Sequence, residues 1–240
     1  MHNTLFATDL DGTLIGDEVS LVELNAKIRW LKKQSNFKLV YVTARSIDSY
    51  RDLALGGQLL EPDALITSLG TEIYVGPTLS KLDGWPTTVD WQADSVRKSL
   101  RVITGLTDQP LVEQNEFKVS YYIQDSGTFE LVKKTLRGHS LEAMYSGTRY
   151  LDILPKGVHK GSAVKHLADA WGIDLSDVVS AGDSPNDIAM LEKYKSIVVG
   201  NAQQRLLDWV ASGDHAKTYL ANGQYGAGVI EGLRYHGVLD

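Results

Sequence analysis

Short apolar runs alternate with amphipathic segments in the first part of this chain. One run, Leu5-Phe6-Ala7, stands almost at the N-terminus, and a second spans residues 37–42. Between them, Leu24, Ile28 and Leu31 are spaced by four and three residues, as in a helix with one buried stripe. Strands that alternate with helices are typical of right-handed crossover units in a parallel sheet. We therefore predict an α/β fold with a doubly wound parallel sheet.

Further segments continue this alternation up to about residue 67 and again after residue 160. They are a helix over 46–55, a helix after Lys160 that passes through 167–171, a helix from Ser184, strands over 64–67, 178–181 and 197–199, and terminal helices. Because the pattern stops and then resumes, the middle of the chain is expected to be an insertion into one sheet.

The segment between Gly76 and Pro155 has a different pattern. It contains turn-forming Gly-Pro and Trp-Pro pairs, a predicted helix over 90–104 and a strand over 117–124 in which apolar and polar residues alternate. Such a strand belongs to a sheet with one apolar face and one polar face, and we expect the polar face to be free for a ligand. The expected domains are a core of residues 1–78 and 156–240 and an inserted α+β domain over 79–155.

Composition excludes several classes of function. The formal charge is −6 and no Lys/Arg stripe is present, so no nucleic-acid partner is expected. The absence of cysteine excludes disulfides, zinc–thiolate sites and thiol nucleophiles, so any metal must use oxygen or imidazole ligands. The apolar runs are far shorter than the ~20 residues of a membrane helix, so no membrane partner is expected. The first strand begins near Thr4, which leaves no room for a signal peptide, and a cytoplasmic location is expected.

Two carboxylates, Asp9 and Asp11, stand one residue apart at the end of the first apolar run. Residues i and i+2 of a strand project to the same side, so both carboxylates can converge beyond the strand's carboxyl end. There they could bind a divalent cation and attack phosphorus. Asp-Gly is also a turn signal, and Asp and Thr are ordinary loop and capping residues. This pair alone leaves both interpretations open.

A second candidate site follows the strand over 37–42. The free N–H groups of a helix N-terminus bind phosphate, and Thr43 and Arg45 would add hydrogen-bond donors there. The alternative is that Thr43 and Ser46 only cap a helix.

Two more candidates lie in the last third of the chain. Lys160 stands at a helix start, where its charge is unfavourable against the helix dipole, so it could instead offset the charge of a bound phosphoryl group. Asp183 follows the strand over 178–181, where a hard cation would sit. Ser184 and Pro185 make a good helix start on structural grounds alone, but that explanation does not cover Asp183.

These four sites occur in order at the carboxyl ends of predicted strands, where open parallel sheets bind their ligands. In order, they resemble the four motifs of the haloacid dehalogenase (HAD) superfamily of phosphotransferases. The matching residues are Asp9-x-Asp11-Gly12-Thr13, Thr43, Lys160 and Gly182-Asp183-Ser184-x-Asn186-Asp187. One departure is Ala44, where glycine is expected after the threonine; it alters how closely the backbone can approach substrate but removes no catalytic group.

The large insertion resembles the cap of the HAD subclass that acts on sugar phosphates, and the chain is most similar to the sucrose-phosphate phosphatases within it. Besides Asp9 to Thr13, this similarity lies in Glu61-Pro62-Asp63, Gly70 to Tyr74, Glu113-Gln114-Asn115, Lys118 to Tyr121, Asp152 to Pro155 and Gly226 to Glu231. The resemblance implies a Rossmann-like HAD core with an inserted cap domain.

The resemblance also implies the catalytic roles. Asp9 would attack phosphorus and form an aspartyl-phosphate. Asp11 would protonate the leaving sugar oxygen and then deprotonate the attacking water. Thr43 and Lys160 would hold the phosphoryl oxygens during transfer.

The cofactor implied is Mg²⁺. Its direct ligands would be Asp9, the backbone carbonyl of Asp11 and Asp183. Asn186 and Asp187 would orient these ligands and Lys160.

The polar face of the inserted sheet is the candidate surface for sugar recognition. The expected substrate-binding residues are Arg45, Gln114, Asn115, Lys118, Ser120 and Asp152. Their side chains supply the donors and acceptors that a hydroxyl-rich ligand needs. For the residues of the inserted sheet, the alternative is an ordinary solvated strand face.

The function expected from these residues and the resemblance is that of a magnesium-dependent phosphoric monoester hydrolase that converts sucrose 6-phosphate to sucrose and phosphate. Alternatives are a phosphatase for mannosyl-3-phosphoglycerate or glucosylglycerol phosphate, or a non-catalytic partner of a sugar-phosphate synthase. Intact Asp9 and Asp11 argue against the last. A P-loop kinase is disfavoured because no Gly-x-x-x-x-Gly-Lys-Ser/Thr loop is present. We also expect a monomer and an association with a sucrose-phosphate synthase.

Overall fold

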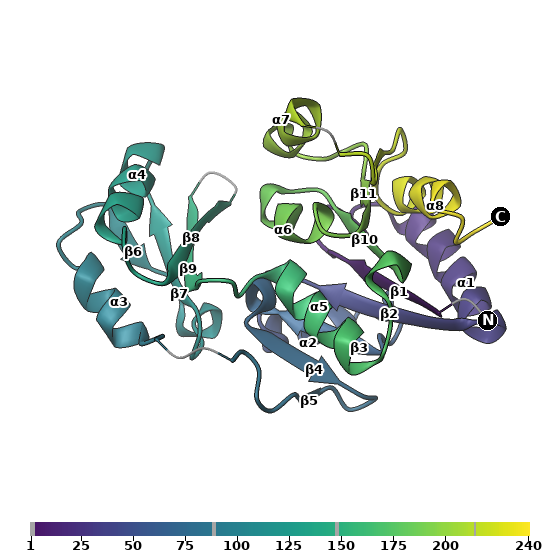
Figure 1. The fold of residues 1–240 in the computed structure, drawn as a ribbon, viewed down its shortest axis with the longest axis horizontal. Helices are drawn as coiled ribbons and strands as arrows, with labels where there is room; N and C mark the ends of the chain where they lie inside the picture. Colours follow the sequence, from purple (N-terminus) through teal and green to yellow (C-terminus); the bar gives the residue numbers. More distant parts are fainter. Residues whose placement is uncertain (1–2, 88–89, 147–148, 214) are drawn as a thin grey trace.

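The computed structural model describes residues 3–87, 90–146, 149–213 and 215–240, which form two sheets with helices packed on them (Figure 1). The larger sheet has the strand order β12-β11-β10-β1-β2-β3-β4-β5. These strands are β1 (Asn3–Thr8), β2 (Asn36–Val42), β3 (Ala64–Thr67), β4 (Glu72–Val75), β5 (Ser80–Lys81), β10 (Val178–Gly182), β11 (Lys195–Val198) and β12 (Thr218–Leu220). From β12 to β3 all neighbours are parallel, and β4 and β5 are antiparallel additions. The predicted α/β fold with a doubly wound parallel sheet is confirmed.

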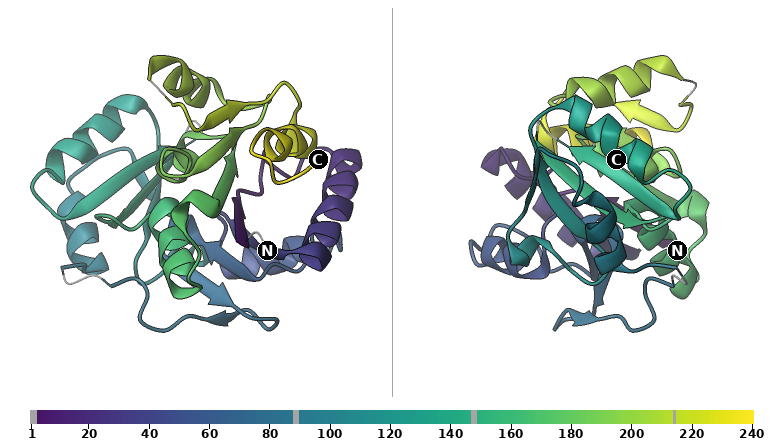
Figure 2. Two further views of the ribbon diagram at one scale, coloured as in Figure 1. Left: turned by 45° about the vertical axis from the view of Figure 1, so that its right-hand side comes forward. Right: turned by 90° about the vertical axis from the view of Figure 1, so that its left-hand side faces the viewer.

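Helices cover both faces of the larger sheet. They are α1 (Glu18–Gln34), α2 (Ile47–Ala54), α5 (Lys160–Ala170), α6 (Ile188–Leu191), α7 (Gln204–Ser212) and α8 (Tyr225–Tyr235), with short 3₁₀ turns η1 (Ser68–Gly70), η3 (Leu175–Asp177) and η4 (Pro185–Asp187). Figure 2 shows α1 and α8, purple and yellow, side by side on one face, with α5 on the other.

The alternation of side chains along β1 explains this layering. Phe6 points into a core formed with α1 and α8, whereas Leu5 and Ala7 point into a core formed with α5. Because a parallel sheet is covered on both faces, its strands read as continuous apolar runs rather than alternating ones.

Helix α1 begins at Glu18, six residues before Leu24, the first residue of its predicted apolar stripe. Asp17 is its N-cap, and the Asp17 carboxylate accepts a hydrogen bond from the backbone N–H of Ser20. This bond satisfies an otherwise unpaired N–H in the first turn. The cap, rather than the buried stripe, therefore sets the start of the helix.

The smaller sheet lies in the inserted segment and has the strand order β6-β7-β9-β8, with every neighbouring pair antiparallel. Its elements are β6 (Leu106–Asp108), β7 (Val119–Ile123), β8 (Leu141–Ser146), β9 (Tyr150–Pro155), α3 (Ala93–Leu100), α4 (Ser126–Thr135) and the 3₁₀ turn η2 (Leu111–Glu113). Val119, Tyr121 and Ile123 pack against α3 and α4, as their alternation predicts. In Figure 1 this unit stands to the left of the larger sheet.

The predicted division of the chain at residues 78 and 79 falls just before β5. Because β5 pairs with β4, the larger sheet continues to Lys81. On the return path, β9 ends at Pro155 in the smaller sheet and α5 begins at Lys160 beside the larger one.

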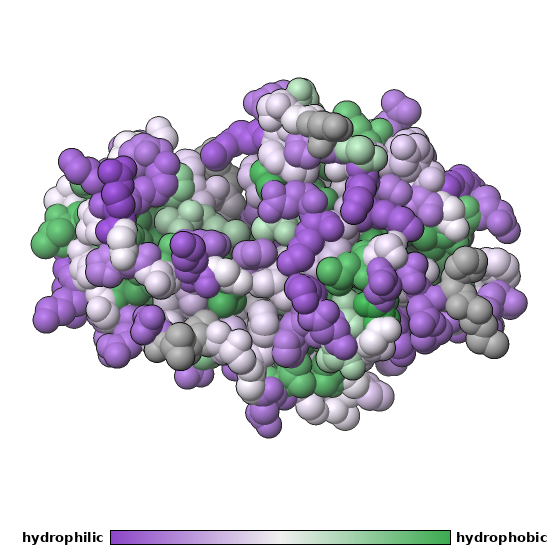
Figure 3. Space-filling model, viewed as in Figure 1, coloured by the Kyte–Doolittle hydropathy of each residue, from purple (hydrophilic) through white to green (hydrophobic). Residues whose placement is uncertain are grey.

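The face seen in Figure 3 is covered largely by polar residues, with apolar residues in scattered patches. Among the described residues, no helix combines the length and apolar character needed to cross a membrane.

Leu24→Ala should lower the free energy of unfolding by about 2–5 kcal/mol, because Leu24 of α1 is fully buried and the change leaves a cavity. Urea unfolding followed by circular dichroism measures the loss. Val22→Ala is the matched control on the same helix, since the Val22 side chain is 62% exposed and its loss should change stability by less than about 0.5 kcal/mol. Equal effects of the two changes would contradict this assignment of the core.

Candidate active site

The candidate catalytic residues gather at the carboxyl edge of the larger sheet. Strand β1 lies between β10 and β2 and is parallel to both, so the residues that follow the three strands emerge at one edge. Asp9 donates its backbone N–H to Ala181 at 3.0 Å, and Thr43 donates its backbone N–H to Ile66 at 2.8 Å. These bonds continue the ladder past the strand ends and fix where both side chains begin.

A fully buried ammonium group lies at the centre of this edge. Lys160 Nζ donates to Asp9 Oδ1 at 2.7 Å and to Asp187 Oδ1 at 2.6 Å. All three side chains are buried. A buried charge is costly unless it is paired and hydrogen-bonded, and here the one cation has two carboxylate partners.

Lys160 is held in place by its helix. It is the first residue of α5, and His159 is the N-cap, with its ring Nδ1 accepting from the backbone N–H of Ser162 at 3.2 Å. The sequence predicts a role for Lys160 other than helix stability. This geometry agrees with that prediction, because the Lys160 ammonium group forms ion pairs with Asp9 and Asp187.

Asp187 organises the loop that carries Asp183. Its Oδ2 accepts from the backbone N–H groups of Asp183 and Ser184 at 3.1 and 3.0 Å, while its Oδ1 faces Lys160. Asp187 therefore contacts both Lys160 and the Asp183 loop, which are the contacts that its predicted orienting role requires.

Carboxylate oxygens of Asp9, Asp183 and Asp187 all lie within 4.8 Å of one another. The Thr13 hydroxyl lies 3.4 Å from Asp9 Oδ2 and 3.2 Å from Asp183 Oδ1, within donor range of each. Hard oxygen ligands of this kind suit a divalent cation.

Asn186 gives an independent sign of a ligand at this place. Within the described residues, its Oδ1 is buried and lacks a hydrogen-bond partner. Buried polar atoms are normally satisfied, so an unpartnered oxygen on the residue that precedes Asp187 is consistent with a bound ion or its water. The residues present fit a divalent metal.

Gly12 is required by the close packing of this cluster. Its φ is +86°, and a Cβ there would lie 2.5 Å from Asp183 Oδ2. Only glycine allows the Asp9–Thr13 loop to approach Asp183 so closely.

Burial and mutual repulsion change the acidity of the carboxyls. Desolvation raises the pKa of Asp9 well above its usual value, with Lys160 opposing it and Asp187 adding to it. Desolvation, followed by the neighbouring Asp187, raises the pKa of Asp183 to about 7. Burial alone would lower the pKa of Lys160, but Asp187 and Asp9 together hold it above its usual value. The cluster thus carries excess negative charge that a cation would relieve.

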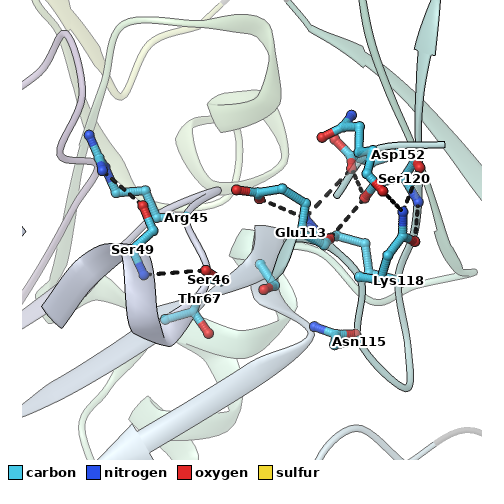
Figure 4. A network of polar contacts seen from close by, with 12 residues as sticks. Arg45, Ser46, Ser49, Thr67, Glu113, Asn115, Lys118, Ser120 and Asp152 are labelled. Carbon is cyan, nitrogen blue, oxygen red and sulfur yellow. Dashed lines mark hydrogen bonds and ion pairs between the residues drawn. The ribbon is translucent and has the colours of Figure 1, made fainter. Parts of the chain in front are cut away.

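Asp11 does not join this cluster through its carboxylate. Arg45 binds it with two hydrogen bonds, from Nε and Nη2, each of 2.7 Å. Arg45 also donates to the Ser49 hydroxyl at 2.9 Å, a bond drawn in Figure 4. The Asp11 side chain is 48% exposed. Arg45, predicted to bind substrate, here orients the residue predicted to be the general acid and base.

The Thr43 side chain is buried near Arg45. Its hydroxyl accepts a hydrogen bond from the backbone N–H of Arg45 at 3.1 Å. This contact stabilises the turn between β2 and α2. The N-cap of α2 is Ser46, whose hydroxyl accepts from the backbone N–H of Ser49, so the capping alternative holds for Ser46 and not for Thr43.

The polar face of the smaller sheet is not free, contrary to the expectation from its alternation. Lys118, Ser120 and Asp152 are all buried. The Ser120 hydroxyl donates to Asp152 Oδ1 at 2.6 Å, and Lys118 Nζ lies 3.6 Å from the same oxygen. These contacts appear on the right of Figure 4.

The segment between β6 and β7 folds back over this face. Both ends of the Gln114 side-chain amide bind the backbone of Ser120, at 2.7 and 2.9 Å. Asn115 Nδ2 donates to the Thr71 hydroxyl at 2.9 Å and so joins the two sheets. The structure brings Gln114 and Asn115 next to Lys118, and both use their amides in internal contacts.

Glu113 is a candidate that sequence reasoning did not include among the site residues. Its side chain is 31% exposed, and its Oε2 lies 3.9 Å from Lys118 Nζ. The pKa of Arg45 is raised mainly by the hydrogen bond to Asp11, and the charge of Glu113 adds to this effect. Figure 4 shows Glu113 between Lys118 and Arg45. The signal available in the sequence was its place beside Gln114 in a segment that carried the family resemblance.

This chain is similar to proteins of known function. The family model for sucrose-6F-phosphate phosphohydrolase matches residues 2–237. Sucrose-phosphatase 1 of Nicotiana tabacum is 32% identical over 95% of this chain, and the match covers 58% of that protein. The chain therefore spans little more than half the length of this curated relative. Mannosylfructose-phosphate phosphatase of Agrobacterium fabrum is 30% identical over 98% of this chain and 97% of that protein.

A solved structure agrees with the fold. The sucrose-phosphatase of Synechocystis, in complex with sucrose and phosphate, has a TM-score of 0.89 at 29% identity and covers 99% of each chain. HAD-superfamily phosphatases of known structure also share the fold, with TM-scores of 0.75 and 0.73 at 18% and 17% identity, a likeness that shows the fold alone.

Magnesium titration near pH 7 should release protons. The pKa of Asp183 is raised to about 7, so this carboxyl is partly protonated there, and a cation needs it ionised. The expected release from Asp183 is on the order of half a proton per cation at pH 7, and apparent affinity should fall as the pH drops below 7. Isothermal titration calorimetry in two buffers of different ionisation enthalpy measures the release.

Asp183→Asn is the test variant for this release, and Asp177→Asn is the control. Asp177 ends η3 just before β10, whereas Asp183 follows β10, so the two carboxyls lie at opposite ends of the same strand. The first change should remove the part of the proton release that comes from Asp183 and weaken binding, and the second should do neither. Identical heats for the wild type in both buffers would contradict the prediction.

Proposed function

The chain belongs to the sucrose-6F-phosphate phosphohydrolase family, and we propose that it is a magnesium-dependent phosphatase that converts sucrose 6-phosphate to sucrose and phosphate. The observation that carries the proposal is the buried Asp9–Lys160–Asp187 cluster, with Asp183 beside it, at the carboxyl edge of the larger sheet. A protein that only binds sugar phosphates has no need of this arrangement.

Asp9 is the proposed nucleophile. Attack of a carboxylate oxygen on phosphorus forms an aspartyl-phosphate and breaks the bond between phosphorus and the sugar oxygen. Lys160 holds Asp9 Oδ1 at 2.7 Å, which keeps the carboxylate in one orientation for attack. Magnesium, held by Asp9, the Asp11 carbonyl and Asp183, would supply positive charge against the phosphoryl oxygens when bound.

Asp11 is the proposed general acid and base. Its proton passes to the leaving sugar oxygen, and the resulting carboxylate then takes a proton from the water that hydrolyses the aspartyl-phosphate. This second step restores Asp9 and releases phosphate. The half exposure of Asp11 supports this role, because the group must reach a leaving oxygen outside the buried cluster. Both Asp11 oxygens accept hydrogen bonds from Arg45, which hold the group as a carboxylate, so the proposed acid step requires Arg45 to release one of them before Asp11 carries the proton.

The sugar is proposed to bind where the smaller sheet faces Arg45. Glu113 supplies an acceptor there, while Gln114 and the buried Lys118, Ser120 and Asp152 hold the segment in place through internal contacts. Asn115 is proposed to fix this surface relative to the larger sheet through Thr71. Such a surface can bind the hydroxyl groups of a sugar through charge-assisted hydrogen bonds.

A second candidate is a phosphatase for another glycosyl phosphate. The match to mannosylfructose-phosphate phosphatase covers nearly the whole of both chains, and that relative is named for a different disaccharide phosphate. The choice between the two substrates rests on the inserted unit. The cytoplasmic location, the monomeric state and an association with a sucrose-phosphate synthase stay predictions.

A phosphate-release assay over a panel of sugar phosphates tests the proposal. We expect magnesium-dependent release, greatest with sucrose 6-phosphate, and its loss when a chelator is added. Release only from a different ester would reject the substrate but keep the reaction class.

Asp9→Asn provides the control for this assay. An amide cannot attack phosphorus as a carboxylate does, so turnover should fall by at least about 10³-fold while substrate binding persists. Turnover retained in this variant would remove Asp9 as the nucleophile.

Glu113→Gln should raise KM for the preferred sugar phosphate by about tenfold with little change in kcat, because the side chain is proposed to contact the sugar rather than the reacting atoms. Steady-state kinetics separate the two constants. Glu116→Gln is the matched control in the same segment, since Glu116 is exposed. A fall in kcat with unchanged KM would contradict a role in sugar binding.

A further inference from the structure

Asn201, in the loop after β11, joins two distant loops through its side-chain amide. Its Nδ2 donates to the backbone carbonyl of Gly12 at 2.7 Å, and its Oδ1 accepts from the backbone N–H of Tyr225 at 2.8 Å. Gly12 follows Asp11 in the nucleophile loop, and Tyr225 begins α8. One side chain therefore links the proposed metal loop to the start of the last helix.

The loop that carries Asn201 is itself fixed. The Gly200 backbone N–H donates to Gly223 at 2.8 Å, and the Gln203 N–H donates to the carbonyl of Asp183 at 2.8 Å. A Cβ at Gly200 would lie 2.5 Å from the carbonyl oxygen of Asn222, so the close approach needs glycine. Asn201 thus stands where the loops after β1, β10, β11 and β12 meet.

Gly12 is held on both sides. Its N–H donates to the carbonyl of Ile15 at 3.2 Å, and its own carbonyl accepts from Asn201. The Asp11–Gly12 peptide is a planar trans unit, so fixing the Gly12 N–H also fixes the Asp11 carbonyl in the opposite direction. The Gly12 carbonyl belongs to the next peptide unit, Gly12–Thr13, so the bond from Asn201 acts on the Asp11 carbonyl through the backbone angles of Gly12. Gly12 has a φ of +86° and the wide conformational freedom of glycine, and holding its carbonyl restricts that freedom.

We propose that Asn201 is a positioning residue that keeps the Asp11–Gly12 peptide, and with it the Asp11 carbonyl, oriented for a divalent cation. Asparagine suits this place because one amide offers a donor to Gly12 and an acceptor to Tyr225 at once. Aspartate has the same shape but no donor, and it would place a charge against a carbonyl oxygen. The inference rests on the proposed function in taking the Asp11 carbonyl as a metal ligand.

Asn201→Asp tests this role by two measurements. The first is the magnesium concentration that gives half of the full rise in melting temperature, which does not depend on catalysis. The second is the magnesium concentration for half-maximal phosphate release. Both should rise by about 10- to 100-fold, as is typical when a group supporting a metal ligand is lost. Unchanged midpoints would overturn the proposal.

Asn36→Asp is the matched control. Asn36 begins β2 at the opposite edge of the sheet and donates to Asn3 Oδ1 at 3.0 Å in an exposed pair, so both magnesium midpoints should stay at the wild-type values. Asn201→Ser serves as a second variant, because the short hydroxyl leaves the gap to Gly12 unfilled without adding charge. It should also raise both midpoints, and it decides the question where Asn201→Asp does not fold.

A purely structural role would give a different result. Melting temperature without magnesium would then fall while both magnesium midpoints stayed constant, and this outcome overturns the proposal. Failure of the proposed function can be told apart from failure of the Asn201 proposal. If the wild type releases no phosphate, the proposed function is wrong, but the magnesium midpoint of the melting temperature still tests Asn201.

Discussion

The buried contact of Lys160 with Asp9 and Asp187 is the interaction on which the rest of the site depends. Removing two carboxylates and an ammonium group from water costs several kcal/mol per ion, and close pairing offsets that cost only when the geometry is well defined. The contact joins the end of β1, the first residue of α5 and η4, which are far apart in the sequence. Packing of α5 and η4 against the sheet edge is therefore coupled to the charge balance of the site.

Parallel topology makes this coupling possible. The strands preceding Asp9, Thr43 and Asp183 are neighbours in one sheet, and their carboxyl ends open at the same edge. Asp183 extends the negative cluster, and the result is a group of carboxyls with raised pKa values beside one fixed cation. Such a site is destabilised until more positive charge arrives, which is the property a metal-dependent phosphoryl-transfer site needs.

Local patterns predicted the core well, because they reflect nearest neighbours in sequence. The strand over 64–67 has the predicted bounds. Asp9, Lys160 and Asp183 gather at the sheet edge, whereas the Asp11 carboxylate binds Arg45 instead of converging with Asp9. The prediction failed for the polar face of β7, because alternation gives the direction of Lys118 and Ser120 but not the segment that covers them. Pairing of Arg45 with Asp11 and of Asn201 with Gly12 spans 34 and 189 residues, and no single-sequence pattern encodes contacts at that separation.

The Gln114 amide fastens the segment before β7 to the backbone of that strand rather than to its side chains. A loop anchored through main-chain atoms keeps its path when the residues it displays are exchanged. Glu113 can therefore be replaced in the course of evolution with the path of the segment kept, since the buried Lys118 ammonium group retains Asp152 as a partner at 3.6 Å. New substrates can be acquired in this way by mutation of one short segment, while the chemistry is inherited unchanged.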